Sequence, residues 1–119
     1  MSSYVSVRGW IECDFKDVPT IKNLAAGSWA SFGKHGLESD AADLYWSGWV
    51  FPEIPINWVA FVFYGGVINS RAYDFFKFVL DEVAKANVEI EGLFYVDFEE
   101  GDDSRVLRVE SGVLLERKR

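Results

Sequence analysis

Apolar and polar residues alternate along the segment from Tyr4 to Cys13 (YVSVRGWIEC). A period of two places successive side chains on opposite faces of a β-strand, so this segment is predicted to be the opening strand. One face is the better candidate for the core because all of its residues are small or apolar. They are Val5, Val7, Gly9, Ile11 and Cys13, whereas the other face carries Tyr4, Ser6, Arg8, Trp10 and Glu12.

A helical period appears between Arg71 and Asn87, where apolar residues recur every three or four positions. Asn69 or Ser70 stands where an N-cap is needed. Phe78 falls on the charged side of this helix. The predicted apolar stripe consists of Ala72, Phe75, Phe76, Val79, Leu80, Val83 and Ala84.

A shorter helix is predicted over Val18 to Ala26, because Asp17 can cap it, Pro19 fits its first turn and Gly27 can end it. The stretch from Gly27 to Asp43 has no clear period and is predicted to be a loop with fragments of structure. Aromatic and β-branched runs predict the remaining strands. These are Leu44 to Phe51, Trp58 to Tyr64, Leu93 to Phe98, and a hairpin of Arg105 to Glu110 and Val113 to Arg117 around Ser111-Gly112.

The connections between most of these strands are short, which favours antiparallel neighbours. We therefore expect an α+β fold with a single, mainly antiparallel sheet of about five to six strands. One long and one short helix should pack on one face of that sheet. A chain of 119 residues has room for one core, so residues 1–119 are predicted to form one domain.

Composition limits the environment in which the protein acts. Aromatic residues make up 17% of the chain, far above what a disordered segment carries. The single cysteine, Cys13, cannot form an intrachain disulfide, and the first thirty residues lack the pattern of a signal peptide. No apolar stretch is long enough to cross a bilayer. These features predict a cytoplasmic protein.

The net charge of −7 is placed unevenly along the chain. A negative field repels nucleic acid and anionic lipid, so neither nucleic acid nor a membrane is expected as a partner. The window from Glu89 to Asp103 has no basic residue and accounts for the whole net charge. Its seven acidic residues are Glu89, Glu91, Asp97, Glu99, Glu100, Asp102 and Asp103.

Few residues suggest chemistry. One histidine, His35, and one cysteine do not make a zinc site, and the pair lacks a third residue that would orient it for nucleophilic catalysis. Gly65-Gly66 lacks a phosphate-loop pattern and is predicted to be a tight turn between strand and helix. The run DFEEGDD lacks the ligand spacing of a calcium loop. We expect no enzyme activity, cofactor or metal; a hydrolase that uses Asp97 with a second carboxylate is a weaker alternative.

The acidic run is the candidate binding site. A solvated loop that keeps a hairpin soluble would also explain it, but so much charge in one window can guide a cationic partner. Phe78 and Trp49 are the candidate apolar anchors, although most large aromatic residues in a small domain belong to the core. The predicted contact residues are Asp97, Glu99, Glu100, Asp102, Asp103, Phe78 and Trp49.

The order of several short motifs resembles a known family. The motifs are Gly9-Trp10 in the first strand, Gly66, Asn69 and Arg71 at the entry of the long helix, GLFYVD at Gly92 to Asp97, and a closing strand pair with Gly112 and Glu116. In this order they resemble the bacterial immunity proteins of polymorphic toxin systems, in particular the immunity protein 7 family found beside contact-dependent growth inhibition toxins. The first helix is shorter than in that family, and Gly27 to Asp43 has no counterpart there.

The resemblance implies a non-enzymatic protein that binds the C-terminal domain of a cognate toxin, a nuclease with a basic groove, and covers its active site or substrate surface. On its own such a protein is expected to be a monomer or a weak dimer. A different class remains open: a small-molecule-binding domain or assembly subunit whose pocket is walled by Trp46, Trp49 or Trp58.

Overall fold

The computed structural model describes residues 3–31, 39–101 and 103–119. One antiparallel sheet of six strands forms the centre of the fold, in the order β2-β3-β1-β4-β5-β6. The strands are β1 (Tyr4–Asp14), β2 (Trp49–Val50), β3 (Val59–Asn69), β4 (Ile90–Phe98), β5 (Ser104–Glu110) and β6 (Val113–Lys118). The helices are α1 (Val18–Trp29), preceded by a 3₁₀ turn at Phe15–Asp17, α2 (Ser39–Trp46) and α3 (Ser70–Ala84). The predicted α+β class is confirmed.

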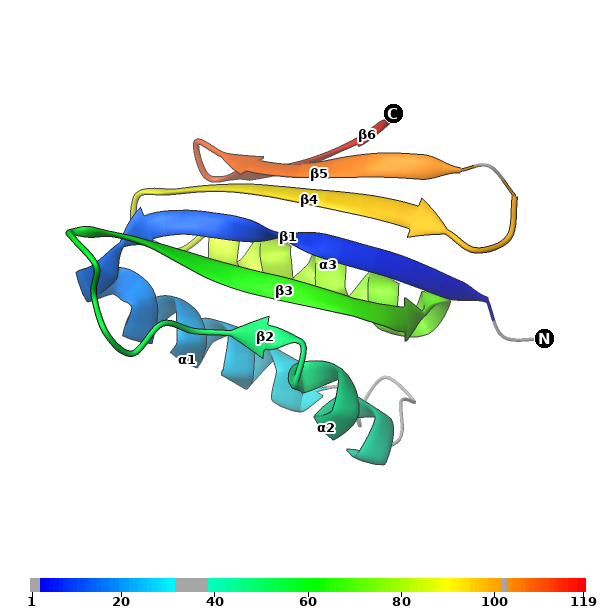
Figure 1. Cartoon of the computed structure of the whole chain (residues 1–119), viewed down its shortest axis with the longest axis horizontal. Helices are drawn as coiled ribbons and strands as arrows, with labels where there is room; N and C mark the ends of the chain where they lie inside the picture. Colours follow the sequence, from blue (N-terminus) through cyan, green and yellow to red (C-terminus); the bar gives the residue numbers. More distant parts are fainter. Residues whose placement is uncertain (1–2, 32–38, 102) are drawn as a thin grey trace.

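The helices α1 and α3 pack against each other on one side of the sheet. Figure 1 shows the sheet from its other side, with α3 behind the central strands and α1 behind β2. The alternation in β1 is as predicted: Val5, Val7 and Ile11 are fully buried beneath the helices. The opposite side of the sheet carries no helix in the described part of the chain.

The strand β1 is the centre of the sheet because it pairs with β3 along its whole length and with β4 along most of it. At Gly9 the backbone of β4 lies close to that of β1. A Cβ atom at Gly9 would lie 2.1 Å from the carbonyl oxygen of Leu93 and 2.6 Å from the Cα atom of Phe94. Only a residue without a side chain fits there.

The helix α3 follows its predicted stripe. Asn69 caps it, since the Asn69 side-chain oxygen accepts a hydrogen bond of 2.7 Å from the backbone N–H of Ala72. All seven residues of the predicted stripe are buried, and Tyr73 is buried with them. The helix ends at Ala84, three residues earlier than predicted.

The prediction of a strand over Leu44 to Phe51 is wrong for most of its length. The helix α2 extends to Trp46, and the strand β2 has only two residues. Trp29 Nε1 donates a hydrogen bond of 2.8 Å to the carbonyl of Ala42, and Ala42 is buried beneath it. Tertiary packing therefore overrides the strand propensity of the aromatic residues here.

The structure differs from two further predictions, one for the stretch after α1 and one for Gly65-Gly66. The helix α1 runs past Gly27 to Trp29, and α2 begins inside the stretch predicted to be a loop; residues 32–38 of that stretch, with His35, lie outside the described residues. Gly65-Gly66 is not a turn, because both residues continue β3 and pair with Arg8 and Val7 of β1. The strand then passes directly into α3 at Ser70.

No described helix combines the length and the apolar character that a membrane span requires.

Candidate functional site

The side of the sheet turned away from α1 and α3, which we call the open face, is rich in apolar side chains. Phe61 and Phe63 on β3 are 40% and 47% exposed, and Val50 on β2 is also exposed. Trp10 and Tyr95 are partly buried by their neighbours. A protein surface seldom leaves so many large apolar side chains together, and such patches mark contact sites.

The strand register gathers these side chains into a continuous cluster. Trp10 on β1 pairs directly with Phe63 on one side and with Leu93 of β4 on the other. The rings of Phe61 and Phe63 stack at 6.3 Å between centroids. Beside the cluster, Gly65 leaves space, since a Cβ atom there would meet no atom within 4 Å.

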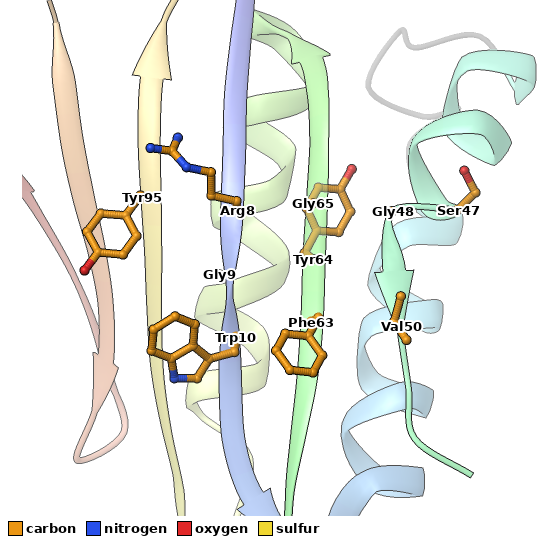
Figure 2. Close-up of a pocket in the computed structure, with 10 residues that line it drawn as sticks. All are labelled: Arg8, Gly9, Trp10, Ser47, Gly48, Val50, Phe63, Tyr64, Gly65 and Tyr95. Atoms are coloured by element: carbon orange, nitrogen blue, oxygen red, sulfur yellow. The ribbon is translucent and has the colours of Figure 1, made fainter.

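A hollow of about 540 Å³ opens over this cluster. Figure 2 shows Trp10 and Phe63 side by side in front of the strands, with Arg8 and Tyr95 next to them and the helices behind. The hollow is broad and open, so it fits a protruding side chain of another molecule better than an enclosed ligand. Its lining residues are Arg8, Gly9, Trp10, Ser47, Gly48, Val50, Phe63, Tyr64, Gly65 and Tyr95.

The loop between β2 and β3 extends the apolar surface at one end of the sheet. Ile56 and Trp58 are 94% and 76% exposed, and Ile54 is also exposed. The backbone N–H of Phe15 donates a hydrogen bond of 2.8 Å to the carbonyl of Trp58, which fixes the loop against the end of β1. A second apolar hollow of about 450 Å³ lies between this loop and Phe61.

Asp97, the first of the predicted contact residues, is held by other residues of the same chain. It accepts a hydrogen bond from Ser104 Oγ and forms a salt bridge of 2.7 Å with Arg8. Arg119 lies 3.7 Å from its other oxygen. The hydrogen bonds from Ser104 and Arg8 hold the pKa of Asp97 below its ordinary value. Much of its charge is thus neutralised within the molecule.

The other residues of the predicted acidic loop differ in whether they form a salt bridge. Asp103 forms a salt bridge of 2.8 Å with Arg105. Glu99 and Glu100 are exposed, and Glu100 accepts a weak hydrogen bond of 3.4 Å from Ser3. Asp102 lies outside the described residues. Only Glu99 and Glu100 therefore offer carboxylates without a salt bridge in the described part of this loop.

A second group of carboxylates, which we call the acidic end, lies at the opposite end of β4. Glu12 of β1 pairs in register with Glu91 of β4, so two like charges face each other. Asp14 and Glu89 flank them around a hollow of about 220 Å³. Within the described ranges none of the four forms a salt bridge. Like charges directly opposite each other destabilise a sheet unless a cation neutralises them.

The sequence window from Glu89 to Asp103 is thus split in space. Because β4 spans nine residues between the two groups, Glu91 and the Asp97 loop lie at opposite ends of the sheet (Figure 1). The concentration of charge seen along the chain is not a single patch. Of its carboxylates without a salt bridge in the described residues, Glu89 and Glu91 adjoin the apolar loop that carries Trp58, whereas Glu99 and Glu100 lie at the other end of β4.

Phe78 and Trp49 lie away from both groups. Phe78 is 45% exposed but projects from α3, on the helical side of the molecule, and its ring contacts Phe75. Trp49 is only 6% exposed and packs in the core against Tyr64 and Phe76. The structure therefore does not present Trp49 as a surface anchor.

Sequence reasoning missed the aromatic residues of the open face. The signal was present in the run from Trp58 to Tyr64, which is apolar at both odd and even positions. A strand of this kind has two apolar faces, and only one of them is covered by helices. Phe61, Phe63 and Trp10 follow from that alternation.

Catalytic or metal chemistry gains no support from the described residues. Burial raises the pKa of Cys13 to about 11, with contributions from Asp17, Asp14 and Glu12, so its thiol is a poor nucleophile at neutral pH. In the described part of the chain, no group of three His, Cys, Asp or Glu residues is arranged to hold a metal ion.

Comparison of the chain with protein-family models, with curated proteins and with solved structures gave no match. The function of the open face therefore has to be inferred from the residues that form it.

A hydrogen-bonded group joins β6 to α3 and makes stability depend on pH. Glu116 accepts hydrogen bonds from Tyr73 and Arg105, both 2.8 Å, and from Lys77 at 3.2 Å. Burial alone would raise the pKa of Glu116, but the hydrogen bonds from Arg105, Tyr73 and Lys77 outweigh it and hold the pKa below its ordinary value. Such a carboxylate stabilises the fold above its unfolded pKa, and this contribution is lost as the pH falls through the folded value.

We therefore expect Glu116→Gln to lower the free energy of unfolding by about 1 kcal/mol at pH 7 and by clearly less at pH 3. Urea denaturation followed by circular dichroism at both pH values measures the difference. Glu110→Gln is the control, because Glu110 is exposed and forms no salt bridge with a described residue. An equal loss at both pH values for Glu116→Gln would contradict this assignment.

Proposed function

We propose that the protein is an inhibitor that acts by binding another protein, and that its contact surface is the open face. The observation that carries this proposal is the uncovered apolar cluster around Trp10 and Phe63, on a domain whose other sheet face packs against helices. Aromatic side chains at the centre of a surface patch are the usual anchors of protein interfaces. The resemblance to immunity proteins supports the same role, with a toxin domain as the partner.

Charge supports a basic partner. The protein carries a net charge of −7, and the carboxylates of the acidic end adjoin the apolar surface without a salt bridge to any described residue. A nuclease binds its substrate through a basic groove, and an acidic inhibitor can cover such a groove. We therefore propose a nuclease toxin, bound in the cytosol of the cell that makes both proteins.

The proposal is tested with the protein encoded in the neighbouring reading frame. Its C-terminal domain is produced alone and together with this chain in bacterial cells, and growth is followed. We expect the domain alone to stop growth and co-production to restore it, with a complex of the two recovered by gel filtration. A domain that is harmless, or whose toxicity persists beside normal amounts of this chain, would overturn the proposal.

Two matched pairs of charge variants locate the carboxylates that matter. Glu12→Gln with Glu91→Gln neutralises the acidic end, and Glu99→Gln with Glu100→Gln removes the same charge at the opposite end of β4. We expect the first pair to slow association with the partner about tenfold at low salt, because these carboxylates adjoin the apolar surface that the partner covers. The second pair should have the smaller effect, because it lies at the far end of the sheet. Stopped-flow association rates measure both effects. A larger effect of the second pair would place the contact at the Asp97 loop instead.

A small-molecule site is the second candidate, and the hollow over Trp10 and Phe63 is the observation in its favour. Trp46 and Trp49, which the sequence suggested as pocket walls, pack together on the helical side instead. A fragment screen by NMR tests this candidate. Fragments that shift the Trp10 indole resonance in the wild type, and that no longer bind the variant Phe63→Ser, would support it. An absence of such fragments would count against it.

A further inference from the structure

The open face carries unpaired charges of both signs, in two separate groups. Glu12 and Glu91 lie in the same row across the sheet as Phe61. Arg108 and Arg117 lie on β5 and β6, where Arg108 pairs with Leu115 and Arg117 with Val106. In the described part of the chain neither group forms a salt bridge. The apolar centre around Leu93 lies between them, since Leu93 pairs with both Trp10 and Arg108.

This arrangement is self-complementary. In a two-fold dimer the same patch serves both copies, and a group that lies away from the axis faces a different group of the other copy. A two-fold axis that lies between the two sheets and passes between the two groups places Glu12 and Glu91 of each copy opposite Arg108 and Arg117 of its partner. The apolar centres of the two faces then meet. We infer that, when no other partner is bound, the open face binds a second copy of this chain face to face.

The size of the face is sufficient for such a dimer. Strands β3, β1, β4, β5 and β6 have 11, 11, 9, 7 and 6 residues. At the usual rise per residue and strand spacing they cover roughly 700 Å² of flat area. Side chains make the accessible area larger than this, so the face reaches the area of about 800 Å² per partner that specific interfaces bury.

The net charge of the chain does not prevent this contact. Two copies with a charge of −7 repel each other at long range. At physiological ionic strength the Debye length is about 8 Å, so distant charges are screened while pairs in contact keep most of their attraction. The local arrangement of charges then decides whether two copies associate.

A charge-exchange experiment tests the inference on the isolated protein. The variant Glu12→Arg with Glu91→Arg makes both groups basic, and Arg108→Glu with Arg117→Glu makes both acidic. In sedimentation equilibrium we expect the wild type to approach twice the mass of the 13.5 kDa chain and each variant to sediment as a monomer. An equimolar mixture of the two variants should recover a dimer, because each acidic group then meets a basic one.

Matched controls separate this result from a general effect of charge. Lys16→Glu with Lys22→Glu, and Glu99→Arg with Glu100→Arg, change the net charge equally at exposed positions outside the two groups. Both controls should remain dimeric. Phe63→Ser removes an exposed ring from the face and should give a monomer. This variant tests the face independently of the charge variants, should one of those fail to fold.

A wild type that stays monomeric up to its solubility limit, or variants that do not associate when mixed although circular dichroism shows them folded, would overturn the inference. The inference does not depend on the proposed inhibitor function, since no other protein takes part in the measurement. If both hold, binding of the partner must dissociate the dimer.

Discussion

Gly9→Ala is expected to lower the free energy of unfolding by about 4 kcal/mol or more, enough to unfold most of a marginally stable domain. The added methyl carbon would lie 2.1 Å from the Leu93 carbonyl oxygen and 2.6 Å from the Phe94 Cα atom. Both are backbone atoms of β4, which is held between β1 and β5 and cannot move aside without breaking hydrogen bonds. Urea denaturation, or the loss of soluble protein, measures the effect.

Gly65→Ala is the matched control for Gly9→Ala. Gly65 lies on β3, pairs with the β1 residue next to Gly9, and leaves open space where its Cβ atom would be. Alanine costs less conformational entropy than glycine in a strand, so we expect stability to rise slightly or to stay within about 1 kcal/mol. Similar losses for the two variants would show that β4 does not approach β1 as closely as described.

Phe63→Asp is expected to weaken binding of the proposed partner at least about 100-fold, because it places a charge at the centre of the apolar cluster. Phe78→Asp is its matched control. The two rings are 47% and 45% exposed, but Phe63 lies on the open face and Phe78 on α3. Calorimetric titration of the partner domain with each variant measures the difference, and thermal melting checks that both remain folded.

We expect Phe78→Asp to bind as the wild type does. If Phe78→Asp abolished binding and Phe63→Asp did not, the contact surface would be the helical layer, as the exposure of Phe78 on the polar side of its helix first suggested. Loss of binding in both folded variants would mean a partner that wraps around the edge of the sheet.

Much of the fold could be predicted from periodicity. The alternation around Val7 and Ile11 fixed the core side of β1, and the stripe of α3 with its Asn69 cap is present as expected. The predictions for these elements are correct because local propensity and burial favour the same structure. The prediction of a strand over Leu44 to Phe51 is wrong because the aromatic residues suit a strand locally, whereas packing of Trp29 on Ala42 favours a helix.

The prediction of a turn at Gly65-Gly66 is wrong for a related reason. Two glycines suggest a turn when only their neighbours along the chain are considered. Here the long strand β1 offers partners for both of them, and pairing with Arg8 and Val7 keeps the chain extended. Contacts between residues far apart in the sequence are what the local pattern does not contain.

The candidate site was harder to predict because its charges are arranged by the sheet register. Glu91 and Asp97 belong to one acidic window in the sequence, yet β4 carries them to different ends of the sheet. Arg8, far away in the sequence, neutralises Asp97, and Glu12 joins Glu91. The pairing of β1 with β4 thus brings a cation to Asp97 and a second carboxylate to Glu91.

The five tryptophans of the chain divide between two environments. Trp29 of α1, Trp46 of α2 and Trp49 of β2 pack together on the helical side, whereas Trp10 lies on the open face and Trp58 in the exposed loop beside it. Indole emission shifts to shorter wavelength when water is removed from the ring. Trp10 and Trp58 are therefore built-in optical reporters: covering the open face should shift their emission to the blue and shield them from acrylamide, without any added label.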